Sequence, residues 1–141
     1  MSKVNQILPY LWLGDIRILE EESFLKNHFI NSVIIINQNE INIKELPFDT
    51  YTYEIIQPEW NGNNVLNMVT SIKESLEIIR FNESKGLGTL IVGEREAQYV
   101  VASYLIVDLK LNRYEANSLI NTRRSCNVLE KYQDILQGLG G

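Results

Sequence analysis

Two short, uninterrupted apolar runs constrain the fold of this chain more than any other feature of its sequence. Residues 32–37 are Ser-Val-Ile-Ile-Ile-Asn, and residues 89–92 are Thr-Leu-Ile-Val. Continuous β-branched runs of this length are typical of strands that are covered on both faces. Strands of that kind belong to parallel sheets with helices packed on each side.

Strand-like and helical segments alternate around these two runs. The sequence predicts a short strand or hairpin over residues 7–14, a short helix over 19–28 and a further strand over 51–56. The clearest helix is Val65–Ile79, because its apolar residues recur at steps of three and four. This alternation is the pattern of an α/β domain.

The part of the chain that follows residue 92 is predicted to be mostly helical. Helical spacing resumes over residues 97–110, and a short helix begins after Asn112, with Glu115 three residues on as a capping box. A last helix is expected over about 128–137. We therefore expect one domain over residues 1–141, with a mainly parallel sheet of about four or five strands flanked by helices.

Composition excludes several classes of function. The chain has 141 residues, of which 45% are apolar and 22% charged, and its formal net charge is −5. This balance argues against nucleic acid as a partner, and no apolar run approaches the roughly 18 residues that cross a membrane. Cys126 is the only cysteine, so no internal disulfide or cysteine-based zinc site can form. These features, with no signal-peptide pattern at the start, lead us to expect an intracellular protein, cytoplasmic or nuclear.

The candidate site is the turn that follows the second buried strand. In parallel sheets, functional loops lie where the carboxyl end of a central strand turns into a helix. In this chain Gly93, Glu94, Arg95 and Glu96 lie between the strand over 89–92 and the next predicted helix. Any chemistry that the fold carries is therefore expected at these residues.

Four blocks of sequence around this turn resemble the dual-specificity protein phosphatase family. They are ILPYLWLG at 7–14, FLKNHFINSVIIIN at 24–37, TLIV at 89–92 with AQYVVASYLI at 97–106, and NRYEANSLINTRR at 112–124. Each resembles a family block, the blocks occur in the family's order, and together they cover nearly the whole chain. The resemblance implies the fold of that family.

The signature of the family is nevertheless missing. The family's phosphate loop has the pattern His-Cys-x5-Arg, and on this sequence the cysteine falls on Gly93, the loop glycine on Glu96 and the arginine on Tyr99. A cysteine phosphatase needs a thiolate nucleophile and a guanidinium that holds the phosphoryl oxygens. We therefore expect an inactive homologue, a pseudophosphatase. Its degenerate phosphate loop comprises Gly93, Glu94, Arg95, Glu96, Ala97, Gln98 and Tyr99.

No other residue replaces the missing nucleophile. Cys126 has Tyr132, not an arginine, six residues further on, and we interpret it as a partly buried structural thiol. His28 is the only histidine and is interpreted as a surface or interface residue. With one histidine and one cysteine, the chain is expected to hold no metal and no other cofactor.

The segment before the first long helix carries two further candidates. The family's general acid, an aspartate, falls near Glu59, which without a nucleophile is most simply a surface acid. Trp60 lies beside it in an Asn-Gly-rich segment. An exposed tryptophan there is a candidate partner contact, and a tryptophan folded over the former pocket is an equal alternative.

Two functions remain open for such a chain. In the first, the fold is a phosphate-independent protein-interaction module, and the surface around Trp60 and Tyr99 faces a protein partner that the sequence does not identify. In the second, it binds phosphorylated proteins without hydrolysing them, through the helix N-terminus and Arg95. Glu94 and Glu96 oppose the second function, because carboxylates repel a phosphate.

A different kind of α/β domain is the remaining alternative. A rhodanese-like enzyme also needs a cysteine in its loop, and residues 93–99 contain none. A nucleotide-binding domain needs a glycine-rich turn after a strand, whereas the Gly-Leu-Gly-Thr at residues 86–89 precedes one. The sequence therefore favours the phosphatase-like domain.

Overall fold

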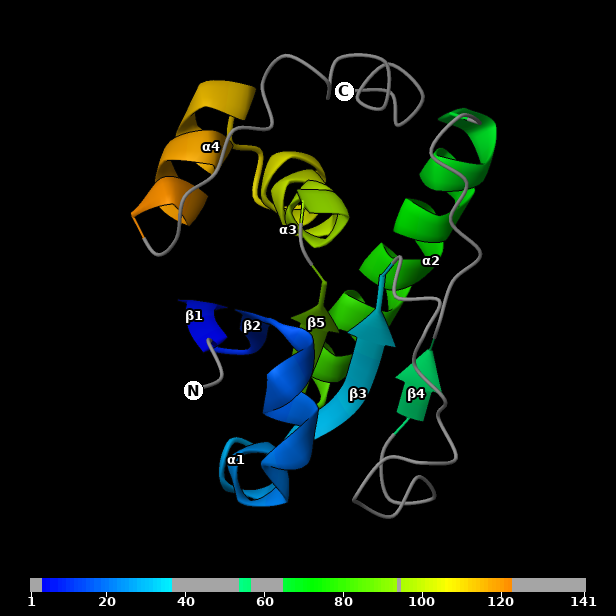
Figure 1. Ribbon diagram of the computed structural model, residues 1–141. Coiled ribbons are helices and arrows are strands. Elements are labelled where there is room, and N and C mark those ends of the chain that lie inside the picture. The colour runs from blue at the N-terminus through cyan, green and yellow to red at the C-terminus, as the bar shows by residue number, and fades with distance from the viewer. Residues whose placement is uncertain (1–3, 37–53, 57–64, 94, 123–141) are drawn as a thin grey trace.

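The computed structural model describes residues 4–36, 54–56, 65–93 and 95–122. These residues form one α/β unit in which a central sheet lies between two layers of helices (Figure 1). The α/β fold class predicted from the two buried runs is confirmed. The helix predicted over 128–137 lies outside the described residues.

The sheet has five strands in the order β1-β2-β5-β3-β4. The strands are β1 (Val4–Leu8), β2 (Leu11–Gly14), β3 (Ile30–Ile35), β4 (Glu54–Ile56) and β5 (Gly88–Val92). The pairs β2–β5, β5–β3 and β3–β4 are parallel, and β1 pairs antiparallel with β2 as a hairpin. The predicted mainly parallel sheet is therefore confirmed, with β5 at its centre.

The helices differ from the predicted ones at their ends. They are the 3-10 helix η1 (Ile16–Glu20) and the α-helices α1 (Glu22–Asn27), α2 (Val65–Ser84), α3 (Arg95–Val107) and α4 (Arg113–Asn121). The single helix expected over 19–28 is split in two. Asp15 starts η1 early by accepting a bond from the Arg17 amide at 3.0 Å, and the non-helical backbone of Glu21 separates η1 from α1.

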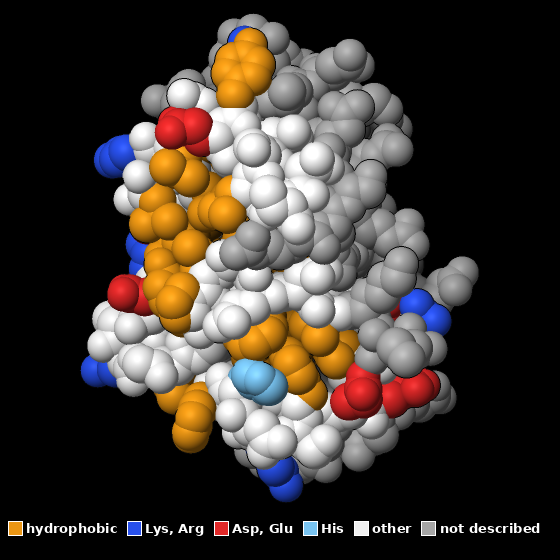
Figure 2. Space-filling view, turned by 90° about the vertical axis from the view of Figure 1, so that its left-hand side faces the viewer, with side chains coloured by type: hydrophobic (Ala, Val, Ile, Leu, Met, Phe, Trp, Pro, Cys, Tyr) orange, Lys and Arg blue, Asp and Glu red, His pale blue; other side chains and the backbone are white. Residues whose placement is uncertain are grey.

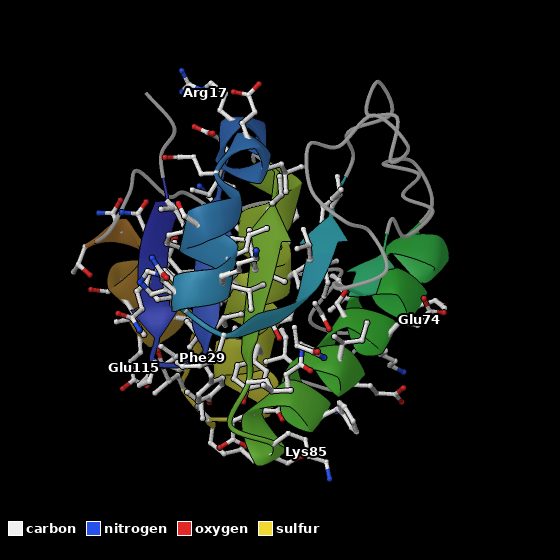
Figure 3. All side chains as sticks on the ribbon, turned by 90° about the horizontal axis from the view of Figure 1, so that it is seen from below. Arg17, Phe29, Glu74, Lys85 and Glu115 are labelled. Carbon is white, nitrogen blue, oxygen red and sulfur yellow. The ribbon has the colours of Figure 1, made fainter. Side chains whose placement is uncertain are left out.

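The two faces of the sheet carry separate cores. On one face, alternate residues of β2 such as Leu11 and Leu13 pack with buried residues of α2, α3 and α4. On the other face, η1 and α1 cover buried residues of β3 and β5, including Val33 and Leu90. Figure 3 shows the two layers from below, with Arg17 of η1 and Lys85 after α2 projecting on opposite sides.

A buried amide fastens α2 to the amino ends of the strands. Asn82 is fully buried, and its Nδ2 donates to Ser32 Oγ at 2.9 Å and to Thr89 Oγ1 at 2.8 Å. Its Oδ1 accepts a bond from Asn31 Nδ2 at 2.9 Å. This network explains why α2 continues past the predicted end at Ile79. Its last turn carries the side chain that joins the helix to β3 and β5.

Helix α3 is joined to its neighbours at the same end of the sheet. The hydroxyl of Tyr104 lies 2.9 Å from the hydroxyl of Tyr10, and the rings meet edge to face. Asp108, just after α3, accepts two bonds from Arg80 of α2, at 2.6 and 2.8 Å. Polar side chains thus connect the β1–β2 turn, α2 and α3.

The capping box predicted for the next helix is present. The Asn112 side chain accepts a bond from the Glu115 amide at 2.8 Å, and the Glu115 carboxylate accepts one from the Asn112 amide at 2.9 Å.

Of the helices that the structure describes, none combines the length and the apolar character that crossing a membrane requires.

Candidate functional site

The candidate site is built where the three central strands end. The residues at these ends are Gly14 of β2, Gly93 after β5 and Ile36 after β3. The Gly93 amide donates to the Gly14 carbonyl at 3.1 Å, and the Ile36 amide donates to the Val92 carbonyl at 2.8 Å. The Gly93 amide is therefore tied to the end of β2, and the preceding Val92 is tied to the end of β3, at the position where parallel sheets bind ligands.

Gly93 takes a conformation that side chains rarely adopt. Its φ is +152°, and a Cβ built on it would lie 2.8 Å from the Ile36 carbonyl oxygen and 3.2 Å from Ala97 Cβ. Real Cβ atoms essentially never approach backbone within 3.0 Å. The backbone here therefore accommodates glycine, and any larger residue requires the chain to shift.

The connection from β5 to α3 is short. Strand β5 ends at Val92 and α3 begins at Arg95, so only Gly93 and residue 94 lie between them. The helix was expected to begin at Ala97, and it starts two residues earlier. Most of the predicted loop over residues 93–99 is thus the first turns of a helix. Ala97 is fully buried and packs closely against Gly93.

Tyr99 does not face a partner surface, contrary to the expectation from the sequence. Its side chain is only 5% exposed and belongs to the core beneath α3. The physical reason is that α3 is buried on nearly all sides. Residues 99–105 are all buried, and Tyr99 packs in the core that α3 shares with the sheet, α2 and α4. Gln98, the residue before Tyr99 in α3, is half-buried.

The other predicted site residues are described only in part or not at all. Arg95 and Glu96 form the first turn of α3, and their side chains lie outside the description. Glu94, Glu59, Trp60 and Cys126 all lie outside the described residues. The structure therefore brings together Gly93 and Ala97, and leaves the proposed roles of Glu59 and Trp60 as predictions.

Sequence reasoning missed the two residues that frame Gly93. The sequence places Gly14 at a turn and Ile36 inside the strand over 32–37, yet they supply the carbonyl that binds the Gly93 amide and the carbonyl that occupies the space of its Cβ. The available signal was their position, because each closes a strand that pairs with β5.

Across the described ranges, no three His, Cys, Asp or Glu side chains gather as a metal site would require.

Comparison with known proteins gives a result for structure but not for sequence. No family model and no curated protein matches the chain. Among solved structures, human DUSP28 aligns with a TM-score of 0.78 at 14% identity, covering 95% of this chain and 90% of that one. The human tyrosine phosphatase-like serine/threonine/tyrosine-interacting protein aligns with a TM-score of 0.77 at 20% identity, covering 97% and 95%.

A third similar structure comes from Entamoeba histolytica. It is a leucine rich repeat and phosphatase domain containing protein, with a TM-score of 0.75 at 15% identity over 99% of this chain and 96% of that one. These alignments span nearly the full chain on both sides. The chain thus has the dual-specificity phosphatase fold, as its four sequence blocks predicted.

Proposed function

We propose that this chain is a pseudophosphatase, a protein-interaction or regulatory module that keeps the phosphatase fold without its chemistry. The observation that carries the proposal is the state of Gly93. In the sequence resemblance, the family's nucleophilic cysteine falls on this residue. A glycine supplies no nucleophile, and the close Ile36 carbonyl leaves no space for a side chain at this position.

Two further observations support the loss of phosphate chemistry. The family's arginine falls on Tyr99, a buried side chain that carries no positive charge. In addition, Glu94 and Glu96 place two carboxylates in the degenerate loop, and carboxylates repel a phosphate. The interaction role is the part of the family's function that does not require the missing nucleophile and guanidinium.

The first test is turnover. The purified full chain is assayed with para-nitrophenyl phosphate and with a phosphotyrosine peptide, beside an active dual-specificity phosphatase prepared in the same way. We expect no turnover above that of a buffer blank. Turnover that disappears on Glu59→Gln would contradict the proposal, because it would assign a working general acid to the chain.

The second test separates the interaction module from the phosphoprotein-binding alternative. The chain is used to capture partners from a native extract, with and without prior phosphatase treatment of the extract. We expect the same partner in both cases, since phosphate is not part of the recognition. Loss of the partner after dephosphorylation would favour the alternative, in which Arg95 and the N-terminus of α3 still hold an anion. Trp60→Ala tests in the same experiment whether Trp60 is a contact.

A further inference from the structure

The two faces of the β1–β2 hairpin are not covered equally. On one face, Ile7, Leu11 and Leu13 are buried under the larger helical layer. The opposite face carries Val4 and Trp12, which pack against the core under η1 and α1 but stay partly exposed. Helix α1 reaches this face of the hairpin through Phe24, whose ring contacts Trp12. The face is nevertheless covered less completely than the opposite one.

Three aromatic rings meet on this less completely covered face. The Trp12 ring lies 5.1 Å from the ring of Phe24 and 4.5 Å from the ring of His28, and the last two rings are 4.4 Å apart. The His28 side chain is exposed, as the sequence predicted. Figure 2 shows the histidine in pale blue beside an apolar patch. We refer to Val4, Trp12, Phe24 and His28 together as the Trp12 face.

The Trp12 face contains a hydrogen-bond donor without an acceptor. Within the described residues, Trp12 Nε1 is the one buried side-chain nitrogen or oxygen that has no partner. Buried donors are nearly always bonded, so an orphan of this kind needs an explanation. The neighbouring His28 ring does not supply the acceptor, since Trp12 Nε1 has no partner and His28 Nδ1 lies 3.0 Å from the Phe24 carbonyl. An acceptor brought by a ligand would satisfy the indole.

The charge around the Trp12 face is negative. Residues 15–28 contain four acidic and two basic side chains. Arg17 forms an ion pair with Asp15 at 3.0 Å. Glu20 and Glu21 are exposed where η1 ends and α1 begins. In Figure 2, acidic side chains lie at the rim of the apolar patch. This combination is complementary to a ligand that is apolar in the middle and positive beside it.

We propose that the Trp12 face binds a segment of a partner protein in which a bulky apolar side chain adjoins lysine or arginine. The apolar side chain packs on Val4 and Phe24, and a backbone carbonyl of the segment accepts the Trp12 Nε1 proton. The basic side chain lies against Glu20 and Glu21. The inference rests on the proposed function, since it names the partner class of the interaction module.

The test starts from peptides selected without bias. A phage library of random peptides is panned on the full chain, and an enriched sequence is synthesised with a fluorescent label for polarisation titrations. We expect enriched peptides to combine arginine or lysine with leucine or an aromatic residue. The chain has two tryptophans, so the Trp60→Phe variant leaves Trp12 as the sole tryptophan, and excitation at the long-wavelength edge of the absorption band selects it over the tyrosines. We expect the peptide to change its emission.

Two variants then divide the recognition into its parts. Trp12→Phe keeps an aromatic ring but removes the donor, and we expect the peptide to bind about tenfold more weakly. Glu20→Gln with Glu21→Gln keeps the shape but removes the charge, and we expect a similar loss together with a weaker salt dependence. The matched control is Glu77→Gln with Glu83→Gln on α2, where both residues are exposed and affinity stays unchanged.

Several results would overturn the proposal. A selection without enrichment would do so, as would peptides without basic residues or binding that is equal in the charge variant and the control. Trp12 emission that changes with protein concentration alone, together with a dimer in sedimentation, would assign the face to a second copy of the chain. Measurable phosphatase turnover would contradict the proposed function and leave this peptide binding intact. A partner captured from the extract that still binds after Trp12→Phe, Glu20→Gln and Glu21→Gln would contradict binding at the Trp12 face and leave the proposed function intact.

Discussion

The two ends of the central strands are secured by different kinds of contact. At the amino ends, polar side chains make the connections, with Asn82 joining α2 to two strands and Tyr104 joining α3 to the hairpin. At the carboxyl ends, Gly93 is held by backbone bonds and by the absence of a side chain. One end should therefore be sensitive to the removal of side-chain atoms, and the other to their addition.

The largest effect is expected at Asn82. Asn82→Ala removes three hydrogen bonds, two of them fully buried, which join Asn82 to the Ser32 and Thr89 hydroxyls and to the Asn31 amide. We expect the free energy of unfolding to fall by about 4 kcal/mol. Urea unfolding followed by circular dichroism measures it. The exposed neighbour on the same helix gives the control, since Glu83→Ala should change stability by less than about 0.5 kcal/mol.

The second effect tests the carboxyl end by adding one carbon atom. Gly93→Ala meets both an unfavourable φ and the Ile36 carbonyl, and we expect a loss of about 3 kcal/mol. Gly86→Ala is the matched control. Gly86 also has a positive φ, +71°, but open space around its Cβ position, so strain alone should cost about 1 kcal/mol. Equal losses at the two glycines would show that the close approach to Ile36 contributes nothing, and the contrast between the two ends would fail.

The third prediction concerns the buried hydroxyl of Tyr104, its hydrogen bond to Tyr10 and its raised pKa. Tyr104 is 3% exposed, and burial followed by its bond to Tyr10 raises the pKa of its hydroxyl well above the ordinary 10.0. Tyr104→Phe should lower the free energy of unfolding by about 1 kcal/mol near neutral pH.

The pH dependence of that difference has a definite sign. The folded chain keeps the Tyr104 proton above pH 10, whereas the unfolded chain loses it, so the stabilisation is complete below about pH 10 and declines as the pH rises further. Unfolding free energies of both proteins between about pH 8 and about pH 11 should therefore converge. Parallel curves would contradict the assignment of a raised pKa to this hydroxyl.

The contrast between the two ends also explains what the sequence was able to predict. The buried strands, the clear α2 periodicity and the capping box at Asn112 are local patterns, and each was found. Asn82 was not, because it lies in a polar stretch after the last periodic apolar residue and nothing local marks it as buried. Its role depends on Ser32 and Thr89, which are brought together only by the sheet.

The candidate site shows the same limit. Sequence reasoning located the turn after β5 and identified Gly93 as the residue without a nucleophile. It placed the start of α3 two residues too late, and it put Tyr99 on the surface because the family's arginine aligns there. The apolar spacing of the helix did not show that residues 99–105 are all buried, which follows from the sheet and the neighbouring helices that pack around α3. The space around Gly93 depends on Ile36, far away in the sequence, and has no local signal.

The smallest effect concerns the outermost contact at the amino end. Arg80 and Asp108 form a two-bond ion pair, but the side chains are 45% and 17% exposed, so water weakens the attraction. A double-mutant cycle with Arg80→Ala and Asp108→Ala should give a coupling of about 0.5 kcal/mol, smaller at high salt. The cycle of Arg80→Ala with Glu77→Ala is the matched control. Glu77 also attracts Arg80, but more weakly, and its coupling should be lower still. A coupling at Asp108 that rivals the loss at Asn82 would mean that the surface, rather than the buried amide, fastens α2 and α3 to this end of the sheet.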